Sequence, residues 1–114
     1  MNFNEYQEGT AKTAIYPGAG NAPTIEGLSY VTLGLAGEAG ELCNKVKKII
    51  RDNGGELTAE AREKLRDELS DVLWYAAQFA TEIGAYLGDV AEANLAKLAD
   101  RAERGVLQGS GDNR

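Results

Sequence analysis

Two pairs of acidic residues stand at helical spacing and are the strongest candidates for chemistry in the sequence. Glu38 and Glu41 form one pair, and Glu68 and Asp71 form the other. Side chains three positions apart in a helix lie on the same side, so each pair can present two carboxylates to one place. Gathered carboxylates repel one another and lose solvation, and a divalent cation relieves both penalties. The pattern therefore indicates a metal site with four carboxylate ligands.

The absence of histidine narrows this chemistry. With no histidine among the 114 residues, the sequence excludes Ser-His-Asp and Cys-His catalysis, histidine-containing zinc sites and the Glu-x-x-His ligation of di-iron bundles. Any metal must then be held by oxygen atoms. Oxygen ligands favour Mg²⁺, with Mn²⁺ as a substitute.

Charge and composition exclude further classes. The net charge of −6 disfavours binding to nucleic acid backbones, which relies on clustered lysine and arginine. No apolar run approaches the roughly 20 residues that span a bilayer, and the first residues lack the pattern of a secretory signal. The single cysteine, Cys43, cannot form an internal disulfide. We therefore expect a cytoplasmic protein with neither a nucleic acid nor a membrane as partner.

The elements that must position these residues are all helical. Hydrophobic periodicity with glycine and proline punctuation predicts helices and no strands. Thr24 and Thr58 are suitable N-caps for the two long helices, and Asp89 with Glu92 resembles a capping box. The expected helices span about residues 4–15, 24–51, 59–86 and 90–104.

These helices predict a single all-α domain over residues 1–104, followed by a flexible tail over residues 105–114. The architecture that we expect is an antiparallel helical hairpin of the four-helix-bundle type. A chain of 114 residues leaves much apolar surface uncovered, so we expect oligomerisation to complete the bundle.

Four glycines interrupt the helix expected over residues 24–51: Gly27, Gly34, Gly37 and Gly40. Each glycine costs a helix up to about 1 kcal/mol relative to alanine. Such a concentration predicts that another backbone or a ligand approaches this helix closely.

Helical-wheel positions suggest how the acidic pairs could meet. Glu38 lies at the edge of an apolar stripe, and Glu41 lies about 60° further toward the polar side. Glu68 and Asp71 have the same offset from the stripe of their own helix. If the helices pack antiparallel through these stripes, both pairs can face one site. The alternative is that the four residues form ordinary solvated helix surface.

A polar stripe on the last expected helix provides cations. Asn94, Lys97 and Arg101 fall within about 60° of one another. An amide beside two cations suits a polyphosphate, although a salt-bridged surface stripe would look the same. Lys45 lies on the carboxylate side of its helix, where it could neutralise acidic neighbours or contact phosphate.

One aromatic residue stands apart from both the core and the acidic faces. Trp74 lies away from the apolar stripe of its helix and from the carboxylates. Because an exposed tryptophan is uncommon, we favour burial in a subunit interface over a base-stacking role.

The acidic motifs and their flanks resemble a known family. Glu38-Ala-Gly-Glu41 and Glu68-Leu-Ser-Asp71, separated by residues 42–67, are similar to the E-x-x-E…E-x-x-D signature of MazG-like nucleotide pyrophosphohydrolases. The resemblance covers most of the chain from about Tyr6. It extends to three flanking segments, Leu33–Leu42, Asp67–Tyr75 and Asn94–Leu98.

The resemblance implies an all-α fold in dimers or tetramers, of which we favour the tetramer. It implies Mg²⁺-dependent cleavage of (deoxy)nucleoside triphosphates between the α and β phosphates, in nucleotide pool housecleaning or balancing. The products would be a nucleoside monophosphate and pyrophosphate. By the same resemblance, Mg²⁺ is ligated by Glu38, Glu41, Glu68 and Asp71, and the phosphates lie near Asn94, Lys97 and Arg101.

The sequence departs from the family pattern at one position. Some relatives carry an additional glutamate where Gly37 stands here. No residue is then an obvious general base. Glu38 and Glu41 are the catalytic candidates, with Glu38 the first choice for the base.

Two other functions are compatible with the same residues. The first is a non-catalytic regulator that binds a nucleotide through the metal site without turnover. The second is a structural helical oligomer with ordinary acidic surface, whose stability Mg²⁺ would not change.

Overall fold

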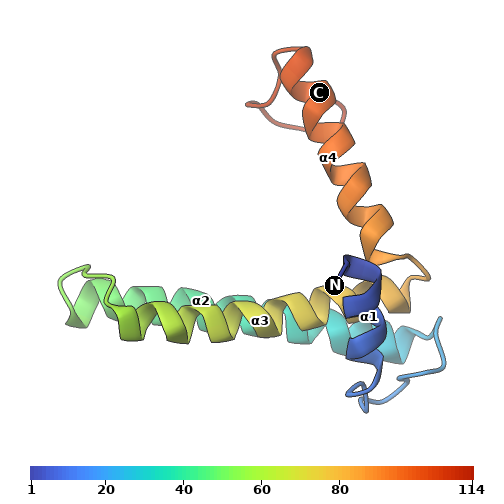
Figure 1. Ribbon diagram of the computed structural model, residues 1–114, viewed down its shortest axis with the longest axis horizontal. Helices are drawn as coiled ribbons and strands as arrows, with labels where there is room; N and C mark the ends of the chain where they lie inside the picture. The colour runs from blue at the N-terminus through green and yellow to red at the C-terminus, as the bar shows by residue number, and fades with distance from the viewer.

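The computed structural model describes all 114 residues, and every regular element in it is a helix. Helices α2 and α3 lie side by side and antiparallel, α1 packs against one end of this pair, and α4 projects away from it (Figure 1). The all-α prediction is confirmed. The single chain does not close a four-helix bundle, because α4 does not pack along the pair. The helices span Phe3–Ala11 (α1), Ile25–Asp52 (α2), Ala59–Glu82 (α3) and Leu87–Glu103 (α4).

Threonine caps start both long helices. The Thr24 hydroxyl accepts a hydrogen bond from the Gly27 amide at 3.0 Å, and the Thr58 hydroxyl accepts one from the Ala61 amide at 3.1 Å. Each cap satisfies one of the amides that the first turn of a helix leaves unpaired. Both predicted N-caps are confirmed.

The connection between α3 and α4 differs from the prediction. Helix α3 ends at Glu82 rather than near Tyr86, because Gly84 takes a left-handed conformation with φ of 72°. Helix α4 then begins at Leu87, and its N-cap residue, Tyr86, makes no side-chain capping bond. The predicted start at Asp89 was therefore wrong. Helix α1 also ends early, at Ala11.

The best-buried part of the molecule lies where α1 and the loop after it meet α3. Only 10 of the 114 residues are buried, and this junction holds most of them. The Tyr16 hydroxyl donates to Glu82 Oε2 at 2.7 Å, and Gln78 Nε2 donates to Thr10 Oγ1 at 2.7 Å. Buried polar groups that are bonded in this way hold neighbouring elements in one arrangement. The junction thus holds one end of the α2–α3 pair.

Two of the four glycines of α2 are explained by side chains of α3. A Cβ atom at Gly27 would collide with the Glu82 carboxylate, and one at Gly34 would collide with the Tyr75 ring. The close approach is thus made by side chains rather than by the backbone or ligand that the sequence suggested. At Gly37 and Gly40 a Cβ atom would meet nothing within 4 Å.

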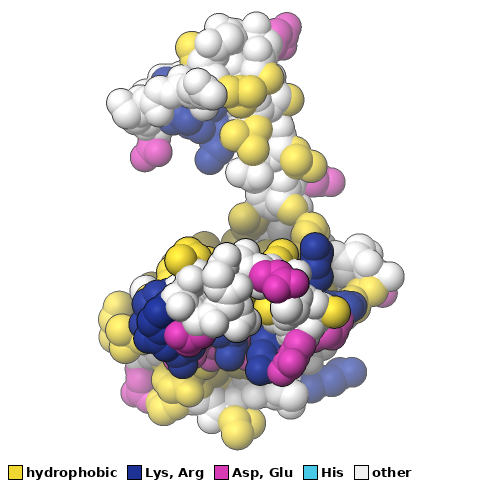
Figure 2. All heavy atoms as spheres, turned by 90° about the vertical axis from the view of Figure 1, so that its left-hand side faces the viewer, with side chains coloured by type: hydrophobic (Ala, Val, Ile, Leu, Met, Phe, Trp, Pro, Cys, Tyr) yellow, Lys and Arg dark blue, Asp and Glu magenta, His cyan; other side chains and the backbone are white.

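Helix α4 and the residues after it form a separate projection. Residues 105–114 fold back on the end of α4, where Arg101 Nη2 donates to the Asp112 carbonyl at 3.1 Å. Leu95 of α4 is 68% exposed and Leu98 is 38% exposed. Figure 2 shows hydrophobic side chains along this projecting helix. None of the four helices combines the length and apolar character that crossing a membrane requires.

Candidate metal centre

Three of the four predicted carboxylates come together between α2 and α3. Glu38 from α2 and Glu68 and Asp71 from α3 place carboxylate oxygens within 4.8 Å of one another. The two α3 residues are one turn apart, and the antiparallel packing brings Glu38 opposite them. Three carboxylates at this spacing can share one divalent cation.

The electrostatics of this cluster fit a cation. Burial, a hydrogen bond with Glu68 and the negative charge of Asp71 raise the pKa of Glu38 above its usual value of 4.5. One lysine forms an ion pair with the cluster: Lys45 Nζ lies 3.5 Å from Glu68 Oε1. One lysine does not balance three carboxylates. The all-oxygen donor set suits Mg²⁺, which takes a few carboxylates and completes its shell with water or phosphate oxygens.

The fourth predicted ligand, Glu41, lies outside this group. It lines a cavity of about 500 Å³ that opens between the C-terminal half of α2 and the N-terminal half of α3. Lys45, Lys48 and Lys64 line the same cavity. Sequence reasoning missed Lys64, although a signal existed: Lys64 stands four positions before Glu68 and so on the same side of α3.

Aromatic side chains adjoin the carboxylates on the other side. The Tyr16 and Tyr30 rings stack at 5.0 Å, and the Trp74 and Tyr75 rings meet edge to face at 5.1 Å. Burial raises the pKa of Tyr75, with smaller contributions from Tyr30 and then from the charges of Glu38 and Asp71. These four rings, Tyr16, Tyr30, Trp74 and Tyr75, form an aromatic cluster that borders the metal centre.

Trp74 is half-buried by contacts within its own chain. Its Nε1 donates to Thr13 Oγ1 at 2.9 Å, and its ring meets Tyr16 edge to face as well as Tyr75. Contacts within its own chain thus cover part of the Trp74 side chain, and the rest remains accessible. The interface role itself stays a prediction.

The predicted phosphate residues of α4 lie apart from the carboxylates within one chain. Helix α4 contacts α1 and α3 but not α2, and it leads away from the pair (Figure 1). Asn94 and Lys97 are exposed, whereas Arg101 is 8% exposed and bonds the Asp112 carbonyl. The single chain does not bring these three residues to the carboxylate cluster.

Comparison with known proteins assigns the family. Residues 27–106 match the family described as MazG nucleotide pyrophosphohydrolase domain, and this range contains all four acidic residues. The protein is similar to the Gene 37 protein of Mycobacterium phage L5, with 57% identity over 114 residues that cover all of both chains. No solved structure matches the protein. The chain therefore belongs to the MazG nucleotide pyrophosphohydrolase family.

Proposed function

We propose that the protein is a Mg²⁺-dependent nucleoside triphosphate pyrophosphohydrolase that converts (d)NTPs into (d)NMPs and pyrophosphate. The observation that carries the proposal is the convergence of Glu38, Glu68 and Asp71 to within 4.8 Å in a member of this family. A cluster of mutually repelling carboxylates lowers stability unless a ligand uses it. The role that fits is housecleaning or balancing of the nucleotide pool in the cytoplasm.

The proposed role of each residue follows from its position in the site. Glu38, Glu68 and Asp71 would hold Mg²⁺, with Mn²⁺ as a substitute, and Glu41 at the edge of the cluster would be a fourth ligand. Mg²⁺, when bound, supplies charge neutralisation on the phosphates and a fixed orientation for the attacking water. Glu38 is the first candidate to accept the proton of that water, because Gly37 stands where some relatives carry an additional glutamate and the role then passes to a residue of the cluster.

Helix α4 suggests how the site is completed. We propose a homo-oligomer, with the tetramer favoured over the dimer, in which α4 of one chain reaches the carboxylates of another. The exposed leucines of α4 and its lack of contact with α2 support this arrangement. Asn94 and Lys97 would then contact phosphate in trans. Arg101 could join them only by leaving the Asp112 carbonyl.

The test measures binding and turnover in the same sample. The full-length protein is incubated with a panel of NTPs and dNTPs and Mg²⁺, and bound and hydrolysed nucleotide are quantified together. Turnover in the wild type and its loss in the Asp71→Asn variant is the expected result. Mg²⁺-dependent binding without turnover would identify a regulator instead. Neither binding nor turnover in the folded oligomer would overturn the proposal.

A further inference from the structure

The cavity next to the carboxylate cluster is lined by lysine side chains from both helices. Its volume of about 500 Å³ lies within the range of about 300–1,000 Å³ that is usual for small-molecule sites. It begins at Glu41, beside the metal centre, and runs along the two helices toward the turn between them, as far as Asn53 and Thr58. We call it the lysine cavity after Lys45, Lys48 and Lys64, which line it from both helices.

Three acidic residues line the lysine cavity: Asp52 and Glu60 have cationic partners, and Glu41 lies at the end beside the metal centre. Both oxygens of Asp52 accept hydrogen bonds from Arg51, at 2.8 and 2.9 Å. Glu60 pairs with Lys64 at 3.1 Å, but both side chains are well exposed and such pairs are weak. Lys48 makes no ion pair at all. The cavity thus offers cations that an anionic group can engage.

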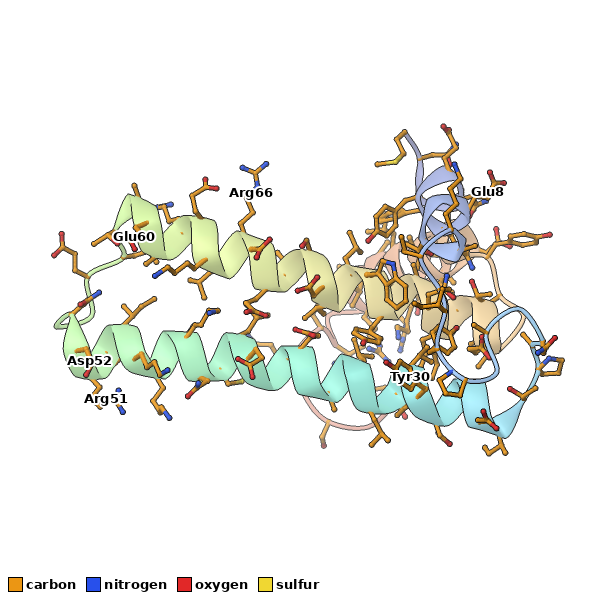
Figure 3. The ribbon with its side chains drawn as sticks, turned by 90° about the horizontal axis from the view of Figure 1, so that it is seen from below. Glu8, Tyr30, Arg51, Asp52, Glu60 and Arg66 are labelled. Carbon is orange, nitrogen blue, oxygen red and sulfur yellow. The ribbon has the colours of Figure 1, made fainter.

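The two helices place three kinds of side chain in the same spatial order. Along α2, Tyr30 comes about 12 Å before Glu38, and Lys45 follows about 10 Å after Glu38. Along α3, the order is reversed in sequence and therefore the same in space: Lys64, then Glu68 and Asp71, then Tyr75. Figure 3 shows Tyr30 toward one end of the α2–α3 pair and Asp52 and Glu60 at the other. Aromatic cluster, carboxylates and lysine cavity therefore follow one another in a line.

We propose that the lysine cavity binds the β- and γ-phosphates of the substrate, so that the nucleotide lies along α2 and α3 with its base toward the aromatic cluster. The proposal rests on the proposed function. It places the α-phosphorus at the carboxylates. Water adds to this phosphorus, the bridging bond to the β-phosphate breaks, its electron pair leaves with pyrophosphate, and one proton of the water is released.

The position of the cavity predicts a selectivity for the number of phosphates in the nucleotide. A diphosphate has no γ-phosphate to reach Lys48 and Lys64, which lie furthest from the carboxylates. Charge-assisted hydrogen bonds to phosphate are among the stronger polar contacts. The lysine cavity would therefore favour triphosphates over diphosphates and would retain pyrophosphate as a product inhibitor.

The experiment removes cations from the cavity and from a matched position outside it. The Lys48→Ala/Lys64→Ala double variant is compared with Lys47→Ala/Arg66→Ala, which loses the same charge at exposed residues that do not line the cavity. Inhibition by pyrophosphate with Mg²⁺, direct binding of pyrophosphate, and kcat/KM for a triphosphate and its diphosphate are measured on the full-length protein. Circular dichroism and gel filtration establish that both variants fold and assemble.

The cavity variant is expected to bind pyrophosphate about tenfold more weakly and to lose most of its preference for triphosphate. The control variant should stay within about twofold of wild type. Turnover with unchanged pyrophosphate binding and unchanged selectivity in the cavity variant would overturn the inference. Absence of turnover in the wild type would overturn the proposed function instead. In that case, pyrophosphate binding that depends on Lys48 and Lys64 would still support the anion site.

Discussion

Lys45 of α2 and Glu68 of α3 form an ion pair, with 3.5 Å between Nζ and Oε1, and this pair marks the boundary between the carboxylate cluster and the lysine cavity. Both side chains are partly accessible, at 32% and 17%. The lysine therefore competes with a divalent cation for the same carboxylate while it stands ready to contact phosphate. Loss of this lysine should therefore have opposite effects on the affinity for metal and on the affinity for nucleotide.

Substitution Lys45→Gln should tighten metal binding and weaken nucleotide binding. A partly exposed ion pair contributes up to about 1 kcal/mol, so the affinity for Mn²⁺ should rise by up to about fivefold. Calorimetric titration of chelator-treated protein measures this affinity, and steady-state kinetics measure the expected rise in KM for triphosphate. Lys47→Gln serves as control. Weaker Mn²⁺ binding in Lys45→Gln alone would show that the lysine organises the cluster rather than competing for it.

Gly34→Ala should destabilise the protein although alanine is the better helix former. The added Cβ would collide with the Tyr75 ring, and overpacking of this kind costs about 1–3 kcal/mol. This cost exceeds the gain of up to about 1 kcal/mol in helix propensity. Urea unfolding at fixed protein concentration gives the difference in the free energy of unfolding.

Gly40→Ala is the matched control for this prediction, because a Cβ atom there meets nothing within 4 Å. Helix propensity alone should then raise the free energy of unfolding, by up to about 1 kcal/mol. Equal effects of the two substitutions, in either direction, would show that the Tyr75 contact does not limit Gly34.

The acidic cluster predicts a pH-dependent stability in the absence of metal. The pKa of Glu38 is raised in the folded protein, chiefly by burial and by the neighbouring carboxylates. The stability that this group contributes is therefore complete below its unfolded pKa and is lost as the pH rises through its folded pKa. With a chelator present, Glu38→Gln should melt about 2–4 °C above wild type at pH 7 and no higher than wild type near pH 4.

The control for this prediction is Glu63→Gln, an exposed position on α3 that does not belong to the cluster. Added Mg²⁺ should raise the melting temperature of wild type more than that of Glu38→Gln, because the variant lacks one ligand. A difference between wild type and Glu38→Gln that does not change with pH would contradict the proposed cause.

Mixed oligomers test whether α4 acts in trans. Lys97→Ala should raise KM about tenfold or more through loss of a charged phosphate contact, and Glu38→Gln should abolish turnover. If the site combines two chains, co-expression of both variants creates sites that contain intact Glu38 and intact Lys97. Activity of the mixture, assayed at substrate concentrations far below KM, should then reach about a quarter of wild type. A mixture no more active than the average of its parents would place both residues in the same chain.

Much of the helical framework followed from the sequence. The starts of α2 and α3 were predicted because threonine caps are local signals that need no tertiary contact. The wheel positions of Glu38, Glu68 and Asp71 pointed to one side of a helical pair, and the structure brings these residues together. Helical-wheel positions could not separate Glu41 from these three residues, because they give the angle of a side chain around its helix but not which residues of the partner helix lie opposite it.

The remaining features depend on contacts between distant residues. Tyr16 is buried and bonds to Glu82, 66 positions away in the chain. Trp74 is partly covered by Tyr16 and Thr13, which also come from the N-terminal segment. The direction of α4 follows from the left-handed turn at Gly84, whereas the sequence pattern extended α3 through that turn.

Product identification tests the central claim most directly. Wild type is incubated with the triphosphate that it turns over fastest and Mg²⁺, and monophosphate, diphosphate, pyrophosphate and orthophosphate are quantified over time. Pyrophosphate and monophosphate should accumulate in equal amounts, with no diphosphate, and Asp71→Asn should form neither product. Orthophosphate with diphosphate, or product formation that is unchanged in Asp71→Asn, would contradict a pyrophosphohydrolase that uses this carboxylate cluster.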